Sequence, residues 1–177
     1  MSITGQYLKI NSKVEVVEKY VAVAIITCIV IIVFSGTVAR YVFKEPLFGA
    51  DRLATYMMVW LGFIGFQIAT SKQRHVEIEF IKTKVKPGVK YLMNIITCIL
   101  ASIFLFIIAV LSYEYMEMSR EMADTDIVLN IPIWWIILIV PVSFLFSGIR
   151  YAFSSLLWYD VLKGRRTEDE IVKKQLL

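Results

Sequence analysis

Residues able to do chemistry are scarce in this chain of 177 residues, which has one histidine, His75, and two cysteines, Cys28 and Cys98. A structural zinc site takes about four Cys or His ligands, and bis-histidine haem ligation inside a helix bundle needs two histidines. No nucleophile–base pair, phosphate-binding loop or zinc signature is present either. The sequence therefore predicts a protein that is not an enzyme and has no catalytic residue, metal site or cofactor of its own.

Charged residues are missing from four long segments, the runs 20–39, 53–71, 91–113 and 127–149. A helix that crosses a hydrocarbon core of about 30 Å needs about 20 mostly apolar residues, and its backbone groups must bond to one another. The composition, 58% hydrophobic and 19% charged, excludes a soluble or disordered chain. We expect an all-α integral membrane protein, one domain over 1–177, with spans at about 20–42, 53–71, 91–113 and 130–152.

Lys and Arg predict the orientation of these spans. The N-terminal segment, the loop 72–90 and the C-terminal segment together carry fifteen of them, whereas the segments 40–52 and 114–129 on the other side carry four. Cytoplasmic segments are enriched in Lys and Arg, so both termini should be cytoplasmic. Trp134 and Trp135 stand near the outer end of the fourth span, where an aromatic belt is expected.

Two segments outside the spans have amphipathic patterns. The segment 6–18 has apolar residues at helical spacing and predicts a helix on the cytoplasmic membrane surface. The stretch 75–81 alternates strictly, which suggests a strand, but one strand has no partner and a short interfacial helix is physically easier. The periodicity does not decide between the two.

The outer loop 114–129 is acidic, with Arg120 as its only cation. Three of its acids lie on one helix face, so the third span should continue outward as a helix. Outer loops commonly lack Lys and Arg, and we favour that plain explanation over a docking patch for an external partner. The docking candidates are Glu114, Glu117, Glu121 and Asp124.

The fourth span should begin near Pro132 and be kinked by Pro141, with neighbouring helices bonding the freed carbonyl. Arg150 is followed by another apolar stretch. It either snorkels from a long tilted helix or pairs with a partner, and we favour snorkelling.

Small residues are spaced for close helix contact, as at Gly62, Gly65 and Ala69 in the second span. Packing within the chain and packing against a partner both explain them. Since ionisable residues usually mark ion and substrate sites in membranes, four runs without any argue against a self-sufficient pump. A small bundle with apolar faces and no site of its own is typical of a subunit.

Several short motifs together resemble one family. They are Arg40-Tyr41-Val42-Phe43, Asp51, 60–65, His75-Val76-Glu77-Ile78-Glu79, and Ile131-Pro132-Ile133-Trp134-Trp135 followed by Pro141 and Arg150. In this order and spacing they resemble the DctQ-type small membrane subunit of tripartite ATP-independent periplasmic (TRAP) transporters, and the sequence as a whole is most similar to the sialic-acid type. One departure is Ala50-Asp51, where the family usually has two acids; another is Gln73-Arg74, where it often has a glycine before the histidine.

The resemblance implies a noncatalytic subunit of a sodium-coupled importer of an organic acid anion, with sialic acid as the expected substrate, in a bacterial inner membrane. In such transporters a periplasmic binding protein delivers the substrate, and a large elevator-type membrane subunit holds the substrate and sodium. The small subunit braces the fixed part of the large one and offers surface to the binding protein. Since the chain ends soon after the fourth span, the large subunit is expected to be a separate polypeptide.

The resemblance and the packing pattern select candidate positions for anchoring helices or contacting the large subunit. They are Arg40, Asp51, Trp60, Gly62, Gly65, His75, Glu79, Trp134, Trp135 and Arg150. Asp51 is also placed to interact with the dipole at the start of the second span. The alternative functions are an autonomous small transporter and a membrane anchor of another complex.

Overall fold

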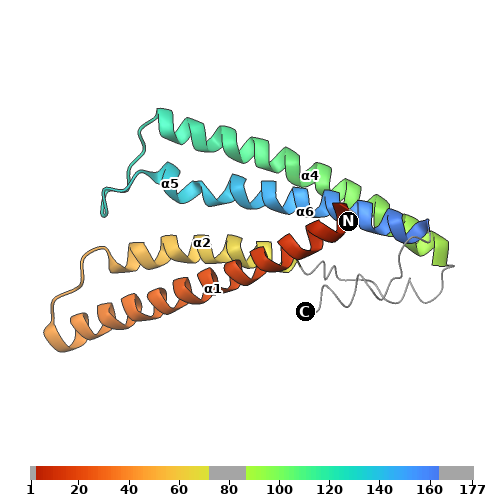
Figure 1. Ribbon diagram of the computed structural model, residues 1–177. Helices are drawn as coiled ribbons and strands as arrows, with labels where there is room; N and C mark the ends of the chain where they lie inside the picture. Colours follow the sequence, from red (N-terminus) through yellow and green to blue (C-terminus); the bar gives the residue numbers. More distant parts are fainter. Residues whose placement is uncertain (1–2, 72–86, 164–177) are drawn as a thin grey trace.

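The computed structural model describes residues 3–71 and 87–163, which form helices joined by short linkers (Figure 1). In chain order these are α1 (Ile3–Val38), the π-helix η1 (Ala39–Phe43), α2 (Ala50–Ser71), α4 (Pro87–Glu121), α5 (Ile133–Ile137) and α6 (Ile139–Leu162). Within these residues there is no strand, only one isolated bridge between Thr125 and Pro132. The expected all-α class is confirmed.

Four helical segments are long and apolar enough to cross a membrane, as predicted. They are Ile10–Phe43, Ala50–Ser71, Gly88–Glu121 and Ile133–Leu162. The segment 6–18 is helical too, but it forms the first turns of α1 and continues into the span without a break. Its position at a membrane surface stays a prediction. The alternating stretch 75–81 lies outside the described residues.

The helices form two hairpins (Figure 1). α1 runs beside α2, α4 runs beside α5 and α6, and the hairpins meet mainly where α2 packs on α6. The linkers 44–49 and 122–132 lie at the same end of the molecule, which we call the loop end. α4 and α6 share an apolar cluster of Cys98, Leu157, Trp158 and Val161.

The fourth span contains a break in its helix, as the presence of Pro141 within it predicts. α5 ends at Ile137 and α6 begins at Ile139, because a proline cannot donate a hydrogen bond to the carbonyl four residues before it, here that of Ile137. A neighbouring helix supports this interruption, since the Trp60 indole of α2 donates to the Ile136 carbonyl at 3.2 Å.

The linker before α2 requires a glycine. Gly49 has φ of 79°, and a Cβ there would lie 2.6 Å from the Leu129 side chain. A positive φ is strained for residues with a side chain, and here the space is already filled. The two linkers of the loop end are thus packed together.

Candidate functional site

Polar side chains follow one face of α2. Tyr56, Trp60, Gln67 and Thr70 follow one another at spacings of four, seven and three residues, so they lie on the same side of the helix. Each bonds to the second hairpin, Tyr56 to the linker between α4 and α5 and the other three to α5 or α6. Apolar rings between them pack edge to face, Phe63 and Phe66 against Phe144. This face of α2 joins the two hairpins.

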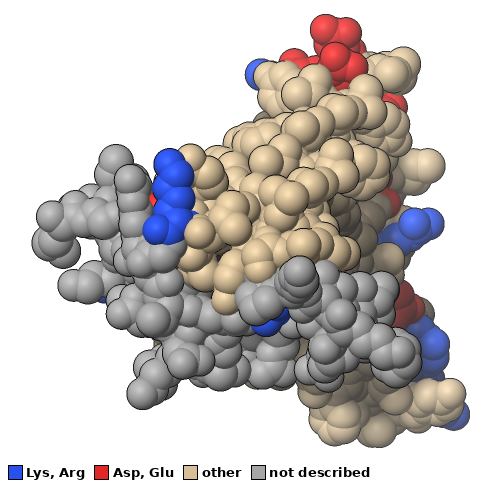
Figure 2. Space-filling view, turned by 90° about the vertical axis from the view of Figure 1, so that its right-hand side faces the viewer, with Lys and Arg blue, Asp and Glu red and all other residues tan. Residues whose placement is uncertain are grey.

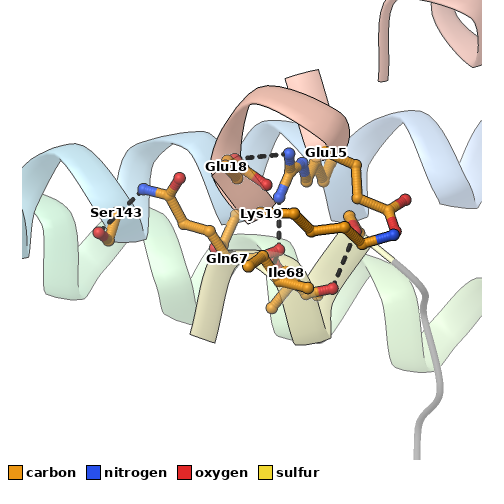
Figure 3. A network of polar contacts seen from close by, with 10 residues as sticks. Glu15, Glu18, Lys19, Gln67, Ile68 and Ser143 are labelled. Carbon is orange, nitrogen blue, oxygen red and sulfur yellow. Dashed lines mark hydrogen bonds and ion pairs between the residues drawn. The ribbon is translucent and has the colours of Figure 1, made fainter. Parts of the chain in front are cut away.

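The most buried ion pair among the described residues is centred on Arg150 of α6. Its guanidinium donates to the Glu18 carboxylate of α1 at 2.8 Å and to the backbone carbonyl of Gln67 in α2. Gln67 also donates from its side chain to the Ser143 hydroxyl at 2.9 Å. Figure 3 shows Glu18, Gln67 and Ser143 of this network, which come from α1, α2 and α6. We call Glu18, Gln67, Ser143 and Arg150 the inter-hairpin cluster.

Burial makes this cluster energetically important. Arg150 is 4% exposed, Glu18 is 9% exposed and Ser143 is fully buried. Taking two charges out of water costs several kcal/mol per ion, so neither charge is tolerable here without the other. The second carboxylate oxygen of Glu18 is buried and accepts no hydrogen bond from the described residues, which makes its single ionic contact the more important.

The prediction that Arg150 snorkels is wrong, and the alternative of a partner is correct. A snorkelling arginine extends its head into water, but this one is 4% exposed and bonds to acceptors supplied by α1 and α2. Glu18 was missed because its partner lies 132 residues away. One feature of the sequence could have indicated such a partner: Arg150 stands within an otherwise apolar stretch, and an arginine buried there requires a hydrogen-bond acceptor.

Asp126 organises the loop end. Its carboxylate accepts backbone hydrogen bonds from Val128 at 2.9 Å and Leu129 at 2.8 Å, and a further one from the Tyr56 hydroxyl. These bonds hold the pKa of Asp126 below its ordinary range, the Tyr56 hydroxyl being the largest cause. The sequence grouped Asp126 with the acidic loop, but the structure gives it a structural role that composition could not indicate.

The predicted docking acids lie on the last turns of α4 and just beyond it. α4 continues to Glu121, as expected from the acids on one helix face. Glu114, Glu121 and Asp124 are exposed, and Glu117 is half-buried beside Arg120 at 3.5 Å. Figure 2 shows acidic side chains gathered at the top of the view above a largely uncharged described surface.

Two predicted positions come together as an exposed pair. Arg40 of η1 donates to the Asp51 carboxylate at 3.0 Å, with side chains 57% and 81% exposed. Asp51 lies in the first turn of α2, where a negative charge is favoured. The pair ties the ends of the first hairpin, and its exposure leaves both residues open to other contacts.

The aromatic and glycine positions differ in their surroundings. Trp60 is held inside the chain, whereas Trp135 is half exposed and Trp134 lies under the Arg120 guanidinium, 5.5 Å from its ring centre. Gly62 and Gly65 are exposed, and a Cβ on either would meet nothing within 4 Å among the described residues. Their face of α2 is therefore not used for packing within that part of the chain. His75 and Glu79 lie outside the described residues.

The described residues contain no group of three His, Cys, Asp or Glu side chains able to hold a metal ion. The largest polar assembly, the inter-hairpin cluster, bonds chiefly to itself and to backbone. The described part of the chain is therefore a joined pair of hairpins with exposed apolar faces and a group of exposed acids at the end of α4.

Comparisons with known proteins agree with this arrangement. The family model described as the DctQ component of tripartite ATP-independent periplasmic transporters matches residues 29–159. A Haemophilus influenzae protein assigned as a TRAP transporter small permease is 25% identical over 99 residues, 56% of this chain and 59% of the relative. The ectoine TRAP transporter small permease TeaB of Halomonas elongata is 24% identical over 122 residues, 69% of this chain and 63% of that protein.

A third relative is the sialic acid TRAP transporter permease SiaT of Haemophilus influenzae, 32% identical over 78 residues, 43% of this chain and 13% of that protein. The alignments thus span about three fifths of the two small permeases and a small part of the third. The family match covers most of the chain and includes α2, α4 and most of α6, whereas Glu18 lies outside it. This chain belongs to the DctQ family, the small-permease component of TRAP transporters.

Proposed function

We propose that this chain is the noncatalytic small subunit of a sodium-coupled TRAP importer in a bacterial inner membrane, and that it braces a separate large elevator-type membrane subunit. The observation that carries the proposal is that apolar helix faces remain exposed on a bundle whose two hairpins are joined by the inter-hairpin cluster. Leu100, Phe104, Ile107 and Leu111 lie on one face of α4, and all are more than half exposed. α1 has a similar face.

A brace must resist deformation while its partner moves. The inter-hairpin cluster supports this role, because a buried and hydrogen-bonded ion pair fixes one relative position of the hairpins. The open glycine face of α2 supports close approach of a partner helix.

The charge distribution supports an orientation with both termini cytoplasmic. The loop end would then face the periplasm, with the exposed acids of α4 available to a substrate-binding protein. We propose an organic acid anion as substrate and sialic acid as the first to test. The name of one partial relative and the overall resemblance favour sialic acid, whereas another relative is named for ectoine.

The test is uptake by liposomes that contain this chain, the large subunit and the binding protein. We expect uptake of labelled sialic acid only when all three are present and a sodium gradient is imposed. Uptake without this chain would contradict the bracing role, and uptake by this chain alone would favour an autonomous transporter. Uptake of another organic acid by the three-part system would correct the substrate alone.

A further inference from the structure

One side chain at the loop end is exposed where an apolar residue is not expected. Ile127 is 98% exposed, more than any other large hydrophobic residue whose exposure the structure describes. Scattered surface hydrophobics are common and need no explanation. Ile127 differs from them because hydrogen bonds hold the backbone on both sides of it.

The residues beside Ile127 form a closed loop. The Ile133 amide donates to the Asp124 carbonyl at 2.9 Å, and the Asp126 amide donates to the Ile131 carbonyl at 2.9 Å. Inside this closure the Asp126 carboxylate accepts the amides of Val128 and Leu129. Hydrogen bonds therefore fix the chain on both sides of Ile127.

Side-chain contacts attach the same loop to the first hairpin. The Tyr56 hydroxyl of α2 donates to Asp126, and the Leu129 side chain lies against Gly49. Asp126 is 8% exposed, one residue before the 98% exposed Ile127. The loop thus buries its polar residue and presents its apolar one, the reverse of the usual surface pattern.

We propose that Ile127 is an apolar contact residue, presented on a preorganised loop, that inserts into a pocket on the substrate-binding protein. The inference rests on the proposed function and identifies which residue of the docking surface makes the central contact. A loop ordered before binding loses little conformational entropy when the partner arrives. Protein interfaces place such apolar anchors within a polar rim.

Charge selects a protein partner rather than a lipid surface. The chain on the N-terminal side of Ile127 carries the exposed acids Glu121 and Asp124. Segments that bind the surface of anionic membranes are rich in Lys and Arg, and acids would be repelled. The partner should therefore have a small apolar pocket with a basic rim.

The experiment measures docking in the reconstituted complex of this chain with its large subunit. The uptake rate is recorded against the concentration of substrate-loaded binding protein. We expect Ile127→Ala to raise the half-saturating concentration about tenfold and to leave the saturated rate unchanged. Because Ile127 is almost fully exposed, the variant should fold normally. Met122→Ala, at a residue 65% exposed just after α4, is the matched control and should behave as wild type.

A second variant tests the loop rather than the contact. Tyr56→Phe removes only the hydroxyl that holds Asp126, and should raise the half-saturating concentration by a smaller factor while Ile127 is intact. In the double variant with Ile127→Ala, Tyr56→Phe should raise the half-saturating concentration little further, because the order of the loop affects docking only through Ile127.

Three outcomes would overturn the inference. Ile127→Ala with wild-type half-saturation, while Glu114→Gln and Glu121→Gln weaken docking, would leave the acidic surface as the dock and remove Ile127 from it. Ile127→Trp whose fluorescence is quenched by brominated lipids without the binding protein would place the residue in the membrane. If neither Ile127 nor the acids affect half-saturation, the proposed docking function itself fails.

Discussion

Arg150 and Glu18 are the residues on which the joined hairpins depend most. Removing one member of a buried ion pair leaves an uncompensated charge and costs about 3–5 kcal/mol. We expect Arg150→Ala and Glu18→Ala each to lower stability by about that amount. Thermal unfolding in detergent measures the loss. The double variant should lose much less than the sum of the two, and full additivity would show that the charges do not depend on each other.

The exposed pair of Arg40 and Asp51 provides the contrasting case. Both side chains are more than half exposed, at 57% and 81%, and exposed ion pairs contribute about 0–1 kcal/mol. Asp51→Ala should therefore leave the unfolding temperature nearly unchanged. If a transporter assembled with the Asp51→Ala chain also takes up substrate at the wild-type rate, Asp51 has no special role at an interface.

Asp126 gives the loop end a defined response to pH. Its folded-state pKa lies below its ordinary value of 3.8, so its bonds stabilise the loop above that value. The stabilisation is lost as the pH falls through the folded pKa. Amide protection of Val128 and Leu129 should be constant from neutral pH down to about pH 4 and fall below it. Asp126→Asn should remove this dependence, and an unchanged acid profile in that variant would contradict the assignment.

Among the elements, the interrupted fourth span depends on support from α2. The Trp60 indole donates to the Ile136 carbonyl beside the interruption. Trp60→Phe keeps the ring volume largely intact and removes the donor, and a net hydrogen bond is worth about 1 kcal/mol. We expect a destabilisation of that order, measured by unfolding in detergent. Wild-type stability of Trp60→Phe would show that the interruption between α5 and α6 does not depend on this bond.

Element positions could be predicted from the sequence because they depend on local properties. A run without charge is sufficient to place a span, and Pro141 interrupts its own helix through the missing amide. The joints between elements could not be predicted in this way. Glu18 looked like part of a polar helix face and Asp126 like one more acid, since each acquires its role from a residue far along the chain.

At the scale of the whole molecule, the described helices leave most of their apolar surface unpaired within the chain. In the most apolar stretch of the first span 11% of the residues are buried, and in that of α4 28% are buried. Lipid can cover such faces, but the open glycine face of α2 and the fixed hairpins are better explained by a protein partner.

The most direct test of the central claim is mild-detergent affinity purification of this chain from native membranes, followed by mass spectrometry of the intact complex. We predict a one-to-one complex with a large multi-span membrane protein. The Arg150→Ala variant should recover less of that partner than Asp51→Ala does. Isolation of the chain alone, monodisperse and stable in several detergents, would contradict the role of a bracing subunit.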